Sequence, residues 1–412
     1  MSTAITKEVP FDDACRFLIK LGEAAHAYGS TAARLEAYLT RMTAAFGLGG
    51  VFRSTPTDIV FAFQEEGDRW QRIHVAKMPG TGLELNRLAK VGELVDAVEA
   101  GQVSLAEAAG RLDEIDKIPH PWGVVANAFS YAFIGSGLAV LFSLGWWDVL
   151  LATLLSLVVY AMVLLSGRFG KRTAEWLPLS SAFVAAFLAG SARVFVPELN
   201  TLMVTLAAIA VLLPGYTISQ GVIELVGQHV VSGTANLMSG LVYLVKQIAG
   251  AWLGVGLAGL LFAVPAAATG APVDAQWLWL FMPLLILGLC MVFQTAPRDL
   301  LAASFGCAIA YGGILLGSAM VGDNLGNLIG TIIAVVFANG WAIKTRRPTS
   351  IVLVPSIILL VSGSIGFRGL AAMAAGQTAM GEQQLLQMFV VALTIAAGLL
   401  VGNTILRPTA SL

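Results

Sequence analysis

The sequence predicts a mostly α-helical membrane protein, with ten transmembrane helices forming a 5+5 inverted repeat after a small α+β cytoplasmic domain. Charge is the first observation behind this fold class, because residues 1–121 contain 30 charged residues and residues 122–412 only 19. The second is a series of ten long apolar segments after residue 121, and the third is an internal similarity within that region. We therefore expect a head over residues 1–121, a first membrane repeat over 122–268 and a second over 269–412.

The head has the charge content of an ordinary soluble domain, about a quarter of its residues. Apolar periodicity predicts helices over 11–27, 31–46, 83–100 and 105–115, and strands over 49–63 and 70–77. Residues 1–20 contain acidic side chains and lack a long apolar core. We therefore expect no signal peptide and a head that stays in the cytoplasm.

The region after the head has enough apolar segments to cross a bilayer many times, since one crossing needs about 20 apolar residues. The segments are 122–144, 149–166, 176–196, 199–218, 235–262, 277–295, 300–320, 324–343, 350–367 and 384–406. With the N-terminus inside, eight of the eleven basic residues in this region fall on cytoplasmic loops or the C-terminus. This distribution agrees with the positive-inside rule and predicts a multi-pass inner-membrane protein with both termini in the cytoplasm.

The internal similarity aligns residues 209–255 with 357–403, without a gap, at an offset of 148. Five glycine pairs coincide, where the glycine content of the two windows predicts about one match by chance. Each copy contains five of the apolar segments. Because five is odd, the second copy must enter the membrane from the opposite side, which is typical of secondary transporters.

Each copy is interrupted at an equivalent position, by Pro214-Gly215 in the first and by Ser362-Gly363-Ser364 in the second. Such breaks free backbone groups, which are tolerated at membrane depth only inside protein or beside a cavity. Helix N-termini there would attract an anionic group such as an amino-acid carboxylate. The alternative is a simple loop in each half. The candidate substrate-binding residues are Pro214, Gly215, Tyr216, Thr217, Ser219, Gln220, Ser362, Gly363, Ser364 and Arg368.

Two charged residues are candidates for ion coupling. Glu224 follows Gln220 by four residues, on the same face if that stretch is helical, and a buried acid there could carry a proton. The alternative is an exposed loop acid. Lys246 lies eleven residues into the fifth segment, where it would balance a buried charge or extend to the membrane surface. We expect the lone His229 to be structural.

Other function classes find less support. At 12% charged residues, the whole chain is not an ordinary soluble enzyme, and a net charge of −1 excludes a strongly basic nucleic-acid binder. The three cysteines are widely spaced and no Cys/His cluster occurs, so we expect no metal and no cofactor. The head has no nucleophile elbow or phosphate-binding loop; only a pairing of Cys15 with His74 would suggest catalysis. The expected partners are a small-molecule substrate, protons and the lipid bilayer, with a homo-oligomer left open.

Several motifs carry a family resemblance by their order and spacing. They are Tyr28-Gly29-Ser30 with Arg34 and Glu36, Pro56-Thr57-Asp58-Ile59, Gly145-Trp146-Trp147-Asp148, Leu213-Pro214-Gly215 with Gly221 and Glu224, and Gly363-Ser364-Ile365-Gly366-Phe367-Arg368. With the head and ten helices, the chain resembles the threonine/serine exporter family over nearly its whole length. Two positions depart from the family pattern: Ser362 replaces a proline, and Asn236 stands where a basic residue is expected.

The resemblance implies export of threonine and serine driven by the proton gradient. We therefore expect a secondary active transporter that exports small polar amino acids by proton antiport. A related exporter split into two chains is linked to dicarboxylates, so a dicarboxylate exporter of the same fold is the main alternative, for which only Arg368 supplies a basic residue at the breaks. A passive channel and a membrane-anchored hydrolase with the head as its enzyme are further alternatives.

Overall fold

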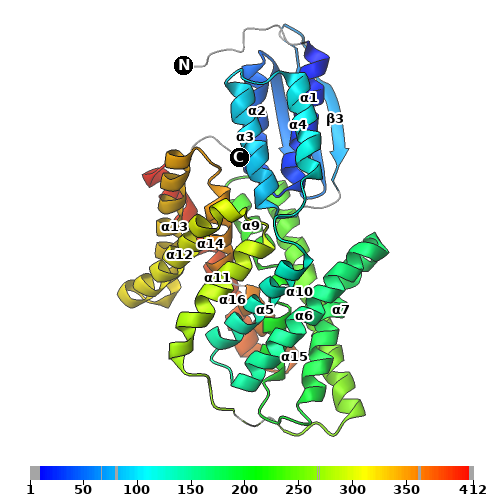
Figure 1. Ribbon diagram of the computed structural model, residues 1–412, viewed down its shortest axis with the longest axis vertical. Helices are drawn as coiled ribbons and strands as arrows, with labels where there is room; N and C mark the ends of the chain where they lie inside the picture. Colours follow the sequence, from blue (N-terminus) through cyan, green and yellow to red (C-terminus); the bar gives the residue numbers. More distant parts are fainter. Residues whose placement is uncertain are drawn as a thin grey trace.

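A computed structural model describes residues 10–65, 67–78, 82–266, 268, 270–360 and 363–407 (Figure 1). The protein is mostly helical. The head lies at one end of the molecule, at the top of Figure 1, and the apolar helices extend away from it.

The head combines four helices with a three-stranded antiparallel sheet of order β1-β2-β3. Its elements are α1 (Phe11–Ala27), α2 (Ala32–Ala45), β1 (Gly49–Ser54), β2 (Asp58–Gln64), β3 (Arg72–Lys77), α3 (Leu85–Glu99) and α4 (Leu105–Lys117). Buried side chains such as Leu21, Leu39 and Phe61 form one core between the helices and the sheet. The expected α+β fold of the head is confirmed.

One strand of the head differs from the prediction. Residues 49–63 were expected to form a single strand, but β1 ends at Ser54 and β2 begins at Asp58. Pro56 has no backbone donor, and the N–H of Thr55 bonds instead to the carbonyl of Asp58, 2.9 Å away. The chain therefore turns here, and Ser54 pairs with Ile59 across a hairpin.

The rest of the chain forms twelve α-helices among the described residues. They are α5 (Val124–Leu141), α6 (Trp146–Phe169), α7 (Lys171–Ala192), α8 (Thr201–Ala208), α9 (Gly215–Val226), α10 (Val230–Leu261), α11 (Leu278–Val292), α12 (Leu300–Val321), α13 (Asp323–Thr345), α14 (Ser350–Leu360), α15 (Gly363–Ala374) and α16 (Thr378–Ile405). Short 3-10 turns, η1 (Ala210–Leu212), η2 (Ala275–Trp277) and η3 (Pro297–Asp299), join some of them.

The number of membrane spans is lower than expected. Within the described residues, eight helical segments are long and apolar enough to cross a membrane, or nine if α8 and the η1–α9 segment, bent by 63°, count as one broken span. The expected third span, α7, is not among them. Glu175 lies at its fifth position, and serine, glycine and alanine lower its mean hydropathy. The count of ten is therefore not supported, and the 5+5 inverted arrangement stays a prediction.

The offset of 148 residues nevertheless recurs in the helix boundaries. Helix α15 ends 148 residues after α9, and α16 starts 148 residues after α10. Helix α9 packs on α10, and α15 packs on α16. The two halves also exchange contacts, because α9 touches α16 and α15 touches α10.

The matched glycines lie where helices approach most closely. A Cβ added to Gly221 would lie 2.8 Å from the Gly233 carbonyl oxygen, and one added to Gly381 would lie 2.7 Å from that of Gly369. In the first half these glycines let α9 approach α10, and in the second half the equivalent glycines let α15 approach α16. Two later pairs have the same role at other contacts. Gly250 and Gly254 of α10 let α7 approach closely, and their equivalents Gly398 and Gly402 of α16 let α13 approach closely.

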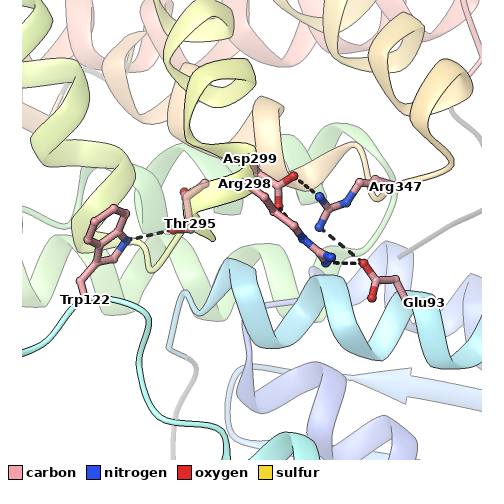
Figure 2. Close-up of polar contacts among 6 residues, drawn as sticks. All are labelled: Glu93, Trp122, Thr295, Arg298, Asp299 and Arg347. Carbon is pink, nitrogen blue, oxygen red and sulfur yellow. Dashed lines mark hydrogen bonds and ion pairs between the residues drawn. The ribbon is translucent and has the colours of Figure 1, made fainter.

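The head is fixed to the apolar helices by backbone and charged contacts (Figure 2). The first two N–H groups of α3 donate to the carbonyls of Phe293 and Gln294, at 3.1 and 3.0 Å, where α11 ends. Glu93 of α3 contacts both Arg298 and Arg347, and Arg347 also binds the buried Asp299. These two arginines therefore bind the head rather than only facing solvent.

Candidate functional site

The first break is a sharp bend followed by a short helix. Pro214 occupies the N-cap position of α9, and the chain bends by 63° between α8 and the η1–α9 segment. The buried Gln247 of α10 donates to the Leu212 carbonyl at 2.9 Å, which satisfies a backbone group that the bend leaves free. Residues 215–226 and 363–374 are helical, so the simple-loop alternative is wrong for both halves.

The two breaks meet in space. A Cβ added to Gly363 would lie 2.9 Å from the Cα of Gly215, so the backbones touch at the first residues of α15 and α9. The first N–H groups of a helix have no partner within it, and the helix dipole makes that end positive. The positive end of α9 therefore lies at this contact. Residues 361 and 362, which would form the second break, lie outside the described residues, so a second helix end at this point stays a prediction.

A cavity of about 420 Å³, here called the central cavity, lies beside this contact. Its lining includes the break residues Pro214, Gly215, Tyr216, Thr217, Gly363 and Ser364, and its polar side chains include Tyr216, Thr217, Ser364 and, from α10, Ser239 and Tyr243. The remaining wall is mainly apolar and comes from α5, α11 and α14. A volume of this order suits a small ligand. Ser362 lies outside the described residues.

Glu224 is buried, with 3% of its side chain exposed, so the exposed-acid alternative is wrong. Its carboxylate accepts hydrogen bonds from Gln220 Nε2 at 3.0 Å, Ser232 Oγ at 2.7 Å and Asn236 Nδ2 at 2.8 Å. The Gln220 contact confirms that the two residues share a helical face. Asn236, one of the two departures from the family pattern, is therefore a direct partner of the carboxylate.

A fourth donor to Glu224 comes from the head. The backbone N–H of Ala32, the first residue of α2, lies 3.4 Å from Glu224 Oε1. One turn further along α2, Glu36 contacts His229 at 3.3 Å, which agrees with a structural role for His229. Sequence reasoning missed this participation of the head, and only the head motifs that carry the family resemblance pointed to it.

A smaller cavity of about 140 Å³, here called the head cavity, separates the head from α9 and α10. Head residues His26, Ser30 and Thr55 line one side, and Gln220 and Glu224 line the other. Tyr216, Thr217 and Leu83 line both this cavity and the central cavity. The two cavities are therefore neighbours that share one wall.

The other predicted site residues lie elsewhere. Ser219 is fully buried with an unpartnered hydroxyl and lines neither of these cavities. The Arg368 guanidinium lies 5.9 Å from the ring centre of Phe142, which lines the central cavity, and has no carboxylate partner among the described residues. Lys246 is exposed, and its ammonium lies 3.4 Å from the Glu175 carbonyl. The expectation of a buried lysine is wrong, and Lys246 follows Ser232, a partner of Glu224, by 14 residues along α10, about 21 Å, which is too far to reach the carboxylate.

A third cavity, of about 530 Å³, is lined by the segment before α6 and by residues of α7, α8, α10 and α15. Asp148, Arg193 and Glu198 are among its lining residues. Asp148 is buried, and it accepts hydrogen bonds from the backbone N–H groups of Gly145 at 3.1 Å and Asn200 at 2.8 Å. It therefore fixes the start of α6 against the start of α8.

The geometry gives little support to a catalytic head. Burial, reinforced by Asp12, raises the pKa of the Cys15 thiol to about 11, so the reactive thiolate is scarce near neutral pH. His74 is exposed on β3 beside Phe61, and no contact joins it to Cys15 within the described part of the head. In the same part of the chain, no three His, Cys, Asp or Glu side chains are grouped as metal ligands.

Comparison with known proteins places this architecture among exporters. The ThrE family model of threonine/serine exporters matches residues 16–258, more than half of the chain. A second model, "Threonine/Serine exporter, ThrE", matches residues 278–405. No solved structure shows a significant match to the chain.

The curated relatives are distant. The "Threonine/serine exporter" of Corynebacterium glutamicum is 23% identical over 418 residues, covering 94% of this chain and 81% of that protein. "Pheromone-regulated membrane protein 10" of Candida albicans is 25% identical over 376 residues, covering 85% of this chain and 33% of that protein. An uncharacterized protein of Schizosaccharomyces pombe is 24% identical over 365 residues, covering 86% and 48%. The chain thus spans between a third and half of these fungal relatives.

Both family models and the bacterial relative name the same family, and the described part of the chain has eight or nine helical segments that could span a membrane. The chain belongs to the threonine/serine exporter family, a family of multi-span membrane transport proteins.

Proposed function

We propose that this protein is a secondary active transporter of the inner membrane that exports small polar amino acids, threonine and serine, in exchange for protons. The observation that carries the proposal is the meeting of Gly215 and Gly363 beside the central cavity, at the N-terminus of α9. The family membership and the printed name of the Corynebacterium glutamicum relative support the substrate class.

The central cavity suits a small hydroxylated amino acid. The N–H groups at the start of α9 offer donors to a carboxylate in a region with little competing water. Hydroxyl groups of Thr217, Ser239 and Ser364 can hydrogen-bond a substrate hydroxyl, while the apolar walls limit its size. The matching helix boundaries at an offset of 148 support two inverted halves that open alternately.

Glu224 is the proton carrier in this proposal. An ionised carboxylate only accepts hydrogen bonds, and four neutral donors surround Glu224. Protonation turns one oxygen into a donor and opposes at least one of these contacts. The change would loosen the packing of α9 against α10 or against the head, and this links proton binding to helix movement. The proposal keeps the orientation that the positive-inside rule predicts, with the head and both chain termini in the cytoplasm.

The second candidate function is export of a dicarboxylate. Arg34 and Arg368 each lack a carboxylate partner among the described residues, and both lie near the central cavity through Tyr216 and Phe142. A substrate with two carboxylates could use both cations. Only one carboxylate is available in threonine and serine.

Flux of labelled L-threonine in proteoliposomes, with and without an imposed pH gradient, tests the proposal. We expect saturable flux that the gradient accelerates and that L-serine blocks. Blockage by succinate but not by serine would instead support the dicarboxylate exporter. Flux that neither saturates nor responds to the gradient would indicate a passive channel.

A further inference from the structure

We propose that the head cavity is a recognition site for the ammonium group of a small α-amino acid, with residues of the head forming half of it. This inference rests on the proposed function, because it assigns the amino group of the exported substrate to a site outside the central cavity. The cavity lies between the turn after α1, the turn between β1 and β2, and helices α9 and α10.

His26 supplies a hydrogen-bond acceptor. Its side chain is 2% exposed, and Nε2 lies 2.8 Å from the carbonyl oxygen of Thr55. A carbonyl can only accept, so Nε2 carries the hydrogen. Burial lowers the pKa of His26 below its ordinary value of 6.5, which keeps the ring neutral. Nδ1 is therefore a buried acceptor, and it has no partner in the structure.

Ser30 adds a second unsatisfied polar atom. It is 8% exposed, and its hydroxyl oxygen is buried without a hydrogen-bond partner. The turn that positions it depends on Gly29, whose φ of +98° suits glycine and where a Cβ would lie 2.6 Å from the Gly82 carbonyl oxygen. Two polar atoms on side chains more than nine-tenths buried thus line the same small cavity without partners, an arrangement that costs stability unless a ligand satisfies them.

The charge in the cavity selects the ligand. Glu224 contributes a buried carboxylate on the wall opposite the head. An acceptor nitrogen, a hydroxyl and a carboxylate together suit a cationic group with several N–H donors, whereas an anion would be repelled by Glu224. A primary ammonium has three donors and one positive charge. It can displace the longest of the four Glu224 contacts, which is the one from Ala32 N at 3.4 Å.

The carboxylate of an amino acid also has a positively charged partner nearby, Arg34. Arg34 of α2 makes no ion pair or hydrogen bond within the described residues, and it lies near Tyr216, which lines the head cavity. A carboxylate bound toward Arg34 and an ammonium bound toward Glu224 would hold a zwitterion at the wall shared with the central cavity. The substrate then binds first in the head cavity and moves from there to the central cavity.

Calorimetric titration of the full-length protein in lipid nanodiscs tests this inference, with L-serine and with glycerate, in which a hydroxyl replaces the ammonium. The variants are Ser30→Ala and His26→Gln, since the glutamine amide can still donate to the Thr55 carbonyl but lacks the Nδ1 acceptor. His74→Gln, at an exposed position of β3, is the matched control.

We expect each variant to weaken L-serine binding by about tenfold, while the control binds like the wild type and glycerate binds far more weakly than serine. Unchanged serine affinity in folded Ser30→Ala and His26→Gln proteins would overturn the inference, as would glycerate binding equal to serine binding. If His26→Gln does not fold, Ser30→Ala decides alone. Wild-type flux of serine with unchanged variant affinities removes only this inference, whereas absence of serine flux and binding in the wild type removes the proposed function with it.

Discussion

The Glu224 carboxylate accepts a hydrogen bond from the backbone N–H of Ala32, a residue 192 positions earlier in the chain. Ala32 begins α2, so the positive end of that helix faces a buried negative charge. The contact makes the head part of the polar site in the apolar helices. A head that only tethered or regulated the transporter would not need to reach this carboxylate.

The contact between the two breaks predicts a strong effect of a single methyl group. In Gly363→Ala, the new Cβ would lie 2.9 Å from the Cα of Gly215, a backbone atom that cannot move aside easily. We expect threonine flux to fall at least tenfold and the thermal midpoint to decrease. Gly312→Ala is the control, because a Cβ at that position in α12 meets nothing within 4 Å. Equal flux in the two variants would contradict the close contact of α9 with α15.

The ion cluster between the head and the apolar helices predicts a measurable loss of stability (Figure 2). Arg347→Ala removes the closest cation from the buried Asp299, and we expect a cost of about 3 kcal/mol. Arg111→Ala removes one partner of the exposed Glu107–Arg111 pair and should cost about 0.5 kcal/mol. Thermal midpoints in detergent compare the two. A similar small shift for both variants would show that the cluster does not hold the head in place.

Burial of His26 predicts a dependence of stability on pH. Because its folded pKa lies below the ordinary value of 6.5, the unfolded chain binds a proton there more readily than the folded chain. The contribution to stability is complete above pH 6.5 and is lost as the pH falls below 6.5 toward the folded pKa. The thermal midpoint of His26→Gln should therefore fall less between pH 7.5 and roughly 5.5 than that of the wild type. His74→Gln should behave like the wild type, and parallel pH profiles for all three proteins would refute the assignment.

The raised pKa of Cys15 predicts slow chemistry at its sulfur. With a pKa of about 11, we expect alkylation by iodoacetamide at pH 8 to be roughly a hundredfold slower than that of a free cysteine. Raising the pH toward 10 should accelerate labelling of the Cys15 peptide, which mass spectrometry can follow. Rapid labelling at pH 7 would indicate an activated thiol and would revive the hydrolase alternative.

The sequence predicted the features that depend on local spacing. Proline and glycine at the breaks, the shared face of Gln220 and Glu224, and the glycine pairs all follow from residues close together in the chain or from the repeat. The α+β fold of the head followed from apolar periodicity in the same way. Its strand boundaries did not, because the turn at Pro56 lies inside an otherwise alternating stretch.

Features that depend on tertiary packing could not be predicted from the sequence. Lys246 is buried or exposed according to which face of α10 packs inward, and its sequence neighbours, apolar apart from Gln247, do not tell which face that is. The contact between Ala32 and Glu224 joins two regions that no periodicity relates. The polar residues His26 and Ser30 gain their importance only from the cavity that the docked head closes.

The most direct test of the account is the acceleration of threonine flux by a pH gradient in Glu224→Gln proteoliposomes, compared with wild type and with Glu382→Gln, a change at an exposed acid in α16. The glutamine amide cannot carry the proton, and its NH2 group opposes the donors of Gln220, Ser232 and Asn236. We predict that Glu224→Gln folds but that the pH gradient does not accelerate its remaining threonine flux, while Glu382→Gln responds like the wild type. Full gradient acceleration in Glu224→Gln would contradict the assignment of proton coupling to this carboxylate.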